Sequence, residues 1–390
     1  MNIAGSKRLK RLGSAIFAEI AEWKEQVRSQ GMDIIDLGIG SPDQPPSPTV
    51  MKALINAVSN PQNYGYPSSE GSLLFRQTVA RWYKHRFDVE LNPDNEILAL
   101  MGSQDGLAHL AMAITDPGDL ALVPDPGYPI YSASLILAGV TAYTMPLRAE
   151  NEYLPNLKDI PVEIAQQAKF MLLNYPSNPL SAVADRAFFE QLVEFAVKNE
   201  IIIVHDLAYS EMTFDGFSPL SILQIAGAKE IAVEFHSLSK SFNMAGCRLA
   251  FMVGNASVVK ALRTLKSNID YGVFLAVQEA GIAALEEDMT HEYTVAKQYE
   301  RRRDLVIEGL KQAGWDIPLP KATMFIWAPI PQGWTSRQIS REILLATGVV
   351  VIPGDAFGLE GEGYVRIALV QNEERLAEAV SRIGRFLHKI

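Results

Sequence analysis

Short apolar runs alternate with longer amphipathic segments through the middle of this chain, and this alternation limits the folds that it can adopt. The runs have the length of buried strands, and the segments between several of them, such as 104–114 and 186–198, repeat apolar residues at helical spacing. The expected strands are residues 96–101, 120–123, 170–173, 201–204, 231–235 and 249–253. We predict an α/β fold with a mainly parallel sheet covered by helices on both faces.

Polar residues follow three of the expected strands. Asn174, Asp206 and Ser237 each lie just past an apolar run. In an open parallel sheet, ligands bind beyond the carboxyl ends of the strands. We therefore expect a ligand site at the sheet edge that these residues share.

The pattern changes after about residue 274, where long helical patterns begin. One of them contains the charged stretch 300–304, whose side chains we expect to face solvent. Further short strands and a last helix are expected at 324–327, 349–352, 364–369 and 373–387. Because 390 residues exceed the usual size of one core, we predict two domains. Residues 46–280 would form a large domain, and residues 1–45 with 281–390 a smaller α+β domain.

The composition of the chain limits the functional classes to which the protein can belong. The formal net charge of −10 argues against a general nucleic-acid binder, which usually presents a basic face. The single cysteine, Cys247, cannot form an internal disulfide and suits a packed neutral thiol, and the six scattered histidines suggest no metal site. Residues 1–24 lack the apolar centre of a signal peptide, and no apolar run reaches about 18 residues. We expect a soluble cytoplasmic protein that binds neither nucleic acid nor membrane.

Lys240 ends the stretch Ser237–Leu–Ser–Lys240, downstream of Asp206–Leu–Ala–Tyr209 and upstream of Arg248. A lysine amine forms an imine with an aldehyde, and that imine exchanges readily with an amino acid. A carboxylate beside a pyridine nitrogen favours its protonated form, and an arginine binds phosphate through a forked contact. The set predicts a binding site for the cofactor pyridoxal 5'-phosphate. Lys240 would hold its aldehyde, Asp206 its ring nitrogen and Tyr209 its phenolic oxygen, while Ser237 and Arg248 would bind the phosphate.

Each of these residues alone also has an ordinary structural explanation. A lone Ser–Leu–Ser–Lys is usually a solvated turn, and an aspartate after an apolar run commonly caps a helix. The prediction depends on the whole set in its order, because several independent elements call for the same cofactor.

Three further segments suit the same site. Residues 101–106 follow a strand and open a helix, so free backbone amides near Ser103 and Gln104 would face a phosphate. Tyr128, in a Pro-Gly turn, would stack on the cofactor ring, and Asn178 would join Tyr209 at the phenolic oxygen. The alternatives are a tight strand-to-helix turn for the first segment and simple packing for Tyr128.

Arg366 lies inside an expected apolar strand of the small domain. A charge there is costly unless it meets an anion, and the α-carboxylate of a substrate is a suitable one. The alternative is a structural ion pair.

Together these motifs resemble those of the fold-type I, class I and II aminotransferases, from the first helix to the last strand. The matching pieces are Leu37–Gly–Ile–Gly–Ser–Pro–Asp43, Tyr66 ahead of Gly71, Gly102–Ser–Gln, Asp125–Pro–Gly–Tyr–Pro, Pro176–Ser–Asn–Pro, Asp206–Leu–Ala–Tyr, Ser237–Leu–Ser–Lys, Arg248 and Arg366.

This resemblance implies a fold, a reaction and an assembly. The fold is that of the fold-type I transferases, and the reaction moves an amino group from an amino acid to a 2-oxo acid, with 2-oxoglutarate as the expected acceptor. Lys240 is implied as the imine-forming lysine and proton shuttle, and Arg366 as the ligand of the substrate carboxylate, aided by the backbone of Gly40. Tyr66 would reach the phosphate of a neighbouring subunit, which implies a homodimer with shared sites.

Within the family, several segments look most like the LL-diaminopimelate aminotransferase branch, although methionine-cycle, alanine and aromatic aminotransferases share many of these motifs. Those segments are 16–20, 33–40, 235–240, 266–268 and 320–323. Two departures, Asn178–Pro–Leu–Ser181 in place of Asn–Pro–Thr–Gly and Cys247 where the family often has Trp, bear on substrate range.

Two other functions remain open at this point. One is a carbon–sulfur β-lyase, which uses the same cofactor chemistry, and the other is a non-catalytic regulator that binds pyridoxal phosphate. A dicarboxylate substrate would also need a second cation. Arg263 and Lys266 are candidates, with surface placement as the alternative.

Overall fold

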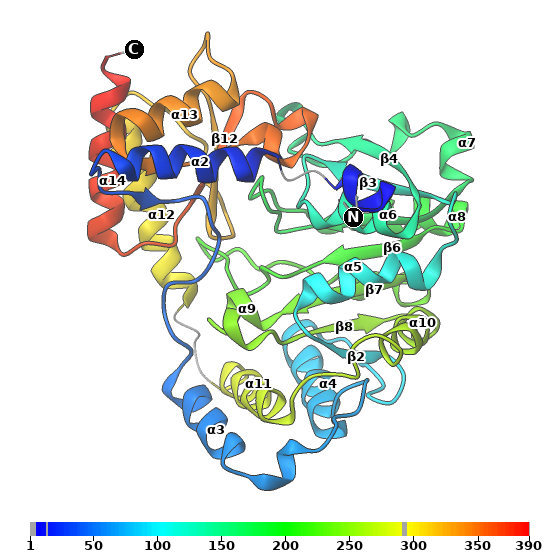
Figure 1. Ribbon diagram of the computed structural model, residues 1–390. Helices are drawn as coiled ribbons and strands as arrows, with labels where there is room; N and C mark the ends of the chain where they lie inside the picture. Colours follow the sequence, from blue (N-terminus) through cyan, green and yellow to red (C-terminus); the bar gives the residue numbers. More distant parts are fainter. Residues whose placement is uncertain (1–4, 13–14, 291–294, 390) are drawn as a thin grey trace.

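A computed structural model describes residues 5–12, 15–290 and 295–389. Its central sheet has, within these residues, seven strands in the order β2-β8-β7-β6-β5-β3-β4 (Figure 1). The strands are β2 (Ile97–Leu100), β3 (Leu120–Asp125), β4 (Thr141–Pro146), β5 (Ala168–Asn174), β6 (Ile202–Asp206), β7 (Ala232–Ser237) and β8 (Ala250–Gly254). Only β8 runs antiparallel to its neighbours in this sheet, so the predicted mainly parallel sheet is confirmed.

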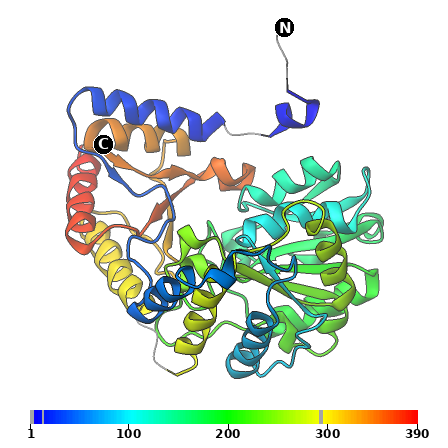
Figure 2. The ribbon, with the colours of Figure 1, turned by 60° about the horizontal axis from the view of Figure 1, so that its bottom comes forward.

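Helices cover both faces of the sheet, as Figure 2 shows. Alternate residues of each strand enter different cores: on β2, Ile97 and Ala99 pack with helices of one face, and Leu98 and Leu100 with those of the other. The first face carries α4 (Leu73–Phe87), α8 (Arg186–Asn199) and α11 (Leu275–Asp288). The second carries α5 (Ser103–Ile114), α6 (Ile130–Ala138) and α10 (Ala256–Lys266).

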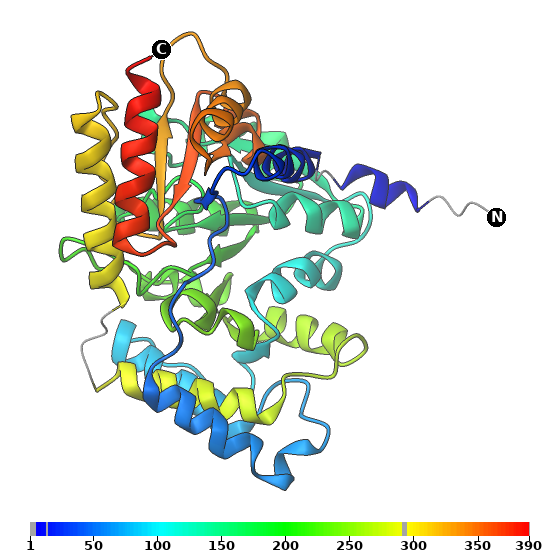
Figure 3. The same cartoon turned by 60° about the vertical axis from the view of Figure 1, so that its left-hand side comes forward.

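A smaller group of elements packs around two apolar clusters beside the sheet (Figures 1 and 3). It contains the antiparallel sheet β11-β12-β9 and the parallel pair β1-β10. These elements are α2 (Ala15–Ser29), β1 (Ile35–Asp36), α12 (Val295–Gln312), β9 (Phe325–Pro329), α13 (Ser336–Thr347), β10 (Val349–Val350), β11 (Ile352–Pro353), β12 (Tyr364–Ala368) and α14 (Glu373–Leu387). The single strand expected at 349–352 is wrong, because Val351 separates two strands that pair with different partners.

Short elements complete the described chain. They are α1 (Lys7–Arg11), α3 (Pro48–Val58), η1 (Pro61–Tyr64), η2 (Ala149–Asn151), η3 (Leu157–Asp159), α7 (Val162–Ala165), η4 (Ile222–Gln224), η5 (Ala228–Glu230), α9 (Leu238–Ser241), η6 (Ala245–Cys247), η7 (Gly354–Phe357) and η8 (Leu359–Gly361).

The predicted domain boundary at residue 280 falls inside α11, which packs against α3 and α4, and the domain limits stay a prediction. No described helix combines the length and the apolar character that a membrane span requires.

The charged stretch 300–304 corrects an expectation. Arg302 and Arg303 are almost fully buried instead of solvated. Arg302 donates to both carboxylate oxygens of Asp43, at 2.7 and 2.8 Å, and Arg303 does the same to Asp215, at 2.6 and 3.1 Å. Carboxylates from distant loops therefore neutralise the two arginines inside the protein.

Candidate active site

A cavity of about 730 Å³ opens at the carboxyl ends of β5, β6 and β7, between the large sheet and β12. Asn174, Asp206 and Ser237, which end these three strands, all line it. The predicted site residues come together here, with the exception of Tyr66. Those that line the cavity are Gly40, Ser103, Gln104, Tyr128, Asn178, Asp206, Tyr209, Ser237, Lys240, Arg248 and Arg366.

Lys240 lies on α9, the short helix that follows β7. The Ser237 hydroxyl caps this helix by accepting from the Ser239 backbone N–H at 3.2 Å. Lys240 Nζ donates to the Gly40 carbonyl and forms no ion pair with a described carboxylate. Burial, together with the positive charges of Arg366 and Arg248, lowers the pKa of Lys240 to about 8. Its amine is therefore unusually ready to react in the neutral form.

Asp206 is buried at the end of β6, where Tyr131 donates its hydroxyl to Oδ2 at 2.8 Å. Burial raises the pKa of Asp206 to about 6, and the Tyr131 hydrogen bond opposes that shift only in part. A cationic group in the cavity would offset this cost. Tyr131 was not predicted as a site residue, although its place three positions after Tyr128 in the same turn and helix is a usable signal.

Asn174 joins the ends of two strands. Its amide donates to the Asp206 carbonyl at 2.7 Å and to the Pro176 carbonyl at 3.1 Å, and its Oδ1 accepts from the Asn178 backbone N–H at 2.7 Å. These bonds fix the turn that presents Asn178 to the cavity. Sequence reasoning placed Asn174 at this sheet edge but gave it no role.

Arg366 projects from β12, the middle strand of its sheet, and is 6% exposed. It donates to Asn178 Oδ1 at 2.8 Å and to the Gly38 carbonyl at 2.5 Å, and its guanidinium lies over the rings of Phe325 and Phe357, at 4.3 and 4.6 Å. Its Nε has no hydrogen-bond partner. No described carboxylate pairs with Arg366, so the alternative of a structural ion pair is wrong for this part of the chain. Burial lowers its pKa to about 10.

The start of α5 meets Arg248 at the other end of the cavity. Gly102 precedes this helix with a φ of +86°, and a Cβ there would lie 2.2 Å from Arg248 Nη2, so only glycine allows this approach. Free N–H groups and a guanidinium thus converge as in a phosphate site. Tyr128, beside them, donates its hydroxyl to Gln104 at 3.0 Å.

Comparison with known proteins decides the family. The family model "Aminotransferase class I and II" matches residues 32–383. The chain belongs to this family. The LL-diaminopimelate aminotransferase of Moorella thermoacetica is 47% identical over 99% of both chains, and that of Halothermothrix orenii is 46% identical over 96% of this chain and 97% of its own.

Solved structures agree with this assignment. Substrate-bound BacF from Bacillus subtilis has a TM-score of 0.94 and 38% identity, covering 99% of this chain and 98% of its own. A probable N-succinyldiaminopimelate aminotransferase from Thermus thermophilus has a TM-score of 0.90 and 39% identity, covering 95% of this chain and 100% of its own. The predictions of a fold-type I fold, a transamination reaction and pyridoxal phosphate are confirmed, and the lyase alternative is not favoured.

The cavity of this aminotransferase fits its cofactor on chemical grounds. Three groups match the aldehyde, the ring nitrogen and the phosphate of pyridoxal phosphate. They are the Lys240 amine with its lowered pKa, the buried Asp206 carboxylate, and Arg248 beside the start of a helix. Each of these groups lacks an oppositely charged partner among the described residues. The unmatched charges are of the kind that the cofactor would satisfy.

Tyr66 lies elsewhere on the aminotransferase surface. It is 90% exposed, does not line this cavity, and packs its ring against Tyr271 with centroids 5.3 Å apart. Within one subunit it is therefore not part of the site.

The two candidates for a second substrate cation are wrong. Lys266 is fully buried, with Nζ 2.5 Å from Asp105 and 2.6 Å from Asp270, and Arg263 pairs with Glu70 at 2.6 Å. Neither lines the cavity. Glu70 neutralises Arg263, and Asp105 and the neighbouring Asp270 neutralise Lys266. The Lys266 ammonium thus binds two members of the cluster Asp105, His109 and Asp270.

Cys247 also borders the site region. It is partly buried against the core, and burial raises the pKa of its thiol, which favours the neutral form.

Proposed function

We propose that this aminotransferase takes LL-diaminopimelate as amino donor and 2-oxoglutarate as acceptor. Two relatives of nearly equal length, both above 45% identity, carry the name LL-diaminopimelate aminotransferase. The observation that carries the proposal is Arg366, a buried guanidinium with a free Nε and no described anion, which faces the cavity that Lys240 lines. It suits the α-carboxylate of an amino acid or a 2-oxo acid.

Lys240 is the catalytic residue in this proposal. The cofactor supplies an aldehyde that combines with amines and a ring that accepts electrons. Lys240 Nζ would hold the cofactor and, when released, would take the proton from the substrate α-carbon and deliver it to the cofactor carbon that carried the aldehyde. Its lowered pKa keeps a useful fraction of the amine neutral near pH 8, as a base at that position requires.

Asp206, Tyr209 and Asn178 would orient the cofactor ring. Asp206 would face the ring nitrogen and stabilise its proton, held in place by Tyr131. Tyr209 and Asn178 would donate to the phenolic oxygen. Because Asn178 Oδ1 already accepts from Arg366, its amide group remains to donate.

The phosphate would lie at the start of α5. Ser103, Gln104 and Ser237 would contribute polar groups there, and Arg248 its guanidinium. Tyr128 would cover the ring face from its position beside Gln104. Gly40 would assist Arg366 through its backbone at the substrate end, close to Lys240.

We also propose a homodimer with shared sites. Exposed apolar side chains gather on α3 and around η1, and the Tyr66–Tyr271 and Tyr64–Phe274 ring contacts join this region to residues 271–274. The exposed members are Met51, Ile55, Val58, Tyr64, Tyr66, Tyr271 and Phe274. We call this set the apolar end patch. A patch of this kind favours association, and Tyr66 would then reach the phosphate site of the partner. Cytoplasmic location stays a prediction.

A donor panel tests the proposed substrates. LL-diaminopimelate, methionine, alanine and phenylalanine are each supplied with 2-oxoglutarate, and glutamate formation is measured. We expect the highest kcat/KM with LL-diaminopimelate and no turnover from a Lys240→Ala control. A higher kcat/KM with methionine, alanine or phenylalanine would refute the substrate, and full turnover by Lys240→Ala would refute the role of the lysine.

A further inference from the structure

Arg11 is the one cation at the cavity that the proposed roles leave unused, among the residues that the structure describes. The positively charged residues lining the cavity are Arg11, Lys240, Arg248 and Arg366. The last three are assigned to the cofactor and to the substrate α-carboxylate. Arg11 forms no ion pair with another described residue, in contrast to Arg263 and Lys266.

The position of Arg11 suits the far end of a substrate. It is the last residue of α1, which lies against α6, one of the cavity walls. Five apolar side chains line the same cavity as Arg11. They are Phe17, Ile39, Ile130, Ala133 and Ile136. A chain of methylene groups would pack against these side chains, with its charged end on Arg11.

We propose that Arg11 binds the distal carboxylate of a dicarboxylic amino acid or 2-oxo acid whose α-carboxylate lies on Arg366. The inference rests on the proposed function for the α-carboxylate, and it adds the residue that selects dicarboxylates. Two arginines that line one cavity together with apolar side chains would recognise the two ends of such a molecule. Asp206 is the only carboxylate that lines the cavity among the described residues, so the wall near Arg11 offers no acidic repulsion.

The test compares two amino acids with the same five-carbon chain. Glutamate has a distal carboxylate, and norvaline ends in a methyl group. The second-order rate constant of each with the holoenzyme is measured from the absorbance change of the bound cofactor. We expect the wild-type enzyme to prefer glutamate, and Arg11→Gln to reduce that preference about 10-fold, as for a lost charge-assisted contact. Arg11→Lys should restore part of the preference.

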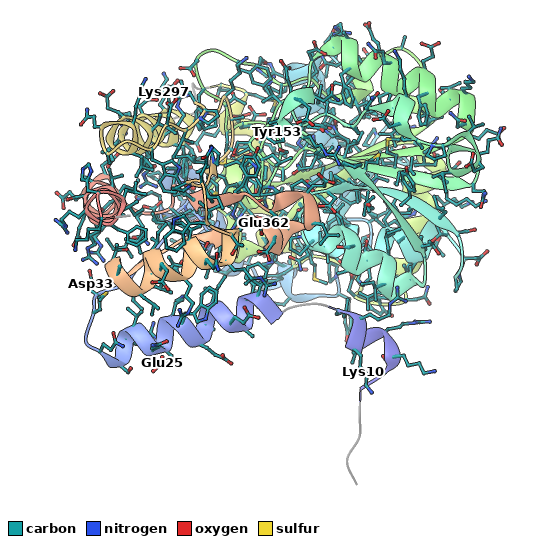
Figure 4. The ribbon with its side chains drawn as sticks, turned by 90° about the horizontal axis from the view of Figure 1, so that it is seen from above. Lys10, Glu25, Asp33, Tyr153, Lys297 and Glu362 are labelled. Atoms are coloured by element: carbon teal, nitrogen blue, oxygen red, sulfur yellow. The ribbon has the colours of Figure 1, made fainter. Side chains whose placement is uncertain are left out.

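Arg8→Gln is the matched control. Arg8 lies on the same helix, is exposed and does not line the cavity, so its removal changes the charge of α1 equally without touching the site. Figure 4 shows the neighbouring Lys10 at the outer edge of the molecule. An unchanged preference in Arg11→Gln, an equal loss in Arg8→Gln, or a wild-type enzyme indifferent to the distal carboxylate would each overturn the inference. This assay does not use LL-diaminopimelate. If LL-diaminopimelate proved to be a poor amino donor, the measured preference for glutamate over norvaline would still test the role of Arg11.

Discussion

At the residue scale, the cavity is defined by charges that the protein itself leaves uncompensated. Neither Lys240 nor Arg366 forms an ion pair with a described carboxylate, and burial lowers the pKa of both side chains. Keeping a buried guanidinium and a partly buried ammonium charged costs stability unless an anion arrives. The substrate carboxylate is the anion that would lower this cost, which couples substrate binding to the charge state of the lysine.

The first prediction concerns the pH dependence of cofactor uptake. The Lys240 pKa near 8 means that its amine is mostly protonated at pH 7 and mostly neutral at pH 9. We expect the rate of pyridoxal phosphate incorporation into apoenzyme to rise with pH through about 8 and then level off. Arg366→Gln removes a positive charge that lowers this pKa, so the midpoint should move to higher pH. Stopped-flow absorbance measures the incorporation rate of the wild-type enzyme and of Arg366→Gln at each pH. Identical midpoints would contradict the effect of Arg366 on the pKa of Lys240.

The sequence revealed most of these residues because the cofactor demands particular side chains in a particular order. It did not reveal Tyr131, whose bond to Asp206 spans 75 positions, nor the burial of Arg302, whose partner lies 259 positions away. Charged residues in a helical pattern indicate a solvated face only when no distant carboxylate meets them. Contacts of this kind follow from tertiary packing and leave no local signal.

At the element scale, strands buried on both faces were predictable and the exposed edge was not. The expected strand at 170–173 lies within β5, whereas β4 was missed because most of its residues are exposed and no apolar run marks it. The loop from β1 to α3 has no periodic pattern, and the role of Gly40 in it was expected only from the resemblance to a known family. It carries Gly38 and Gly40, whose carbonyls accept from Arg366 and Lys240.

The Asp43–Arg302 pair fixes the far end of that loop. Asp43→Ala leaves a fully buried guanidinium without its carboxylate, and we expect a loss of about 3 kcal/mol in the free energy of unfolding. Because the loop also positions Gly40, kcat/KM should fall as well. Glu25→Ala is the control: Glu25 pairs with Arg28 on the exposed side of α2 (Figure 4), and its loss should cost at most about 0.5 kcal/mol. Urea titration distinguishes the two variants, and equal stabilities would show that the buried pair has no special role.

At the scale of the whole molecule, the cavity of one subunit contains every predicted site residue except Tyr66. That exception is informative, because Tyr66 belongs to the apolar end patch and is 90% exposed. A large aromatic side chain at such a position either leaves its apolar surface exposed to water or contacts another molecule. A second copy of the chain would cover the patch and bring Tyr66 to a phosphate site at the same time.

Ile55→Glu tests this assembly. Ile55 lies on α3 within the apolar end patch and is 61% exposed, so a carboxylate there would be buried without a partner in a dimer but would be harmless in a monomer. We expect wild-type enzyme to sediment as two chains and Ile55→Glu as one, with weaker cofactor binding because Tyr66 no longer reaches its partner. Val197→Glu, at 53% exposure on α8, places the same charge outside the patch and should remain dimeric. A monomeric wild-type enzyme with full activity would show that one chain forms a complete site, and Tyr66 would then have no part in catalysis.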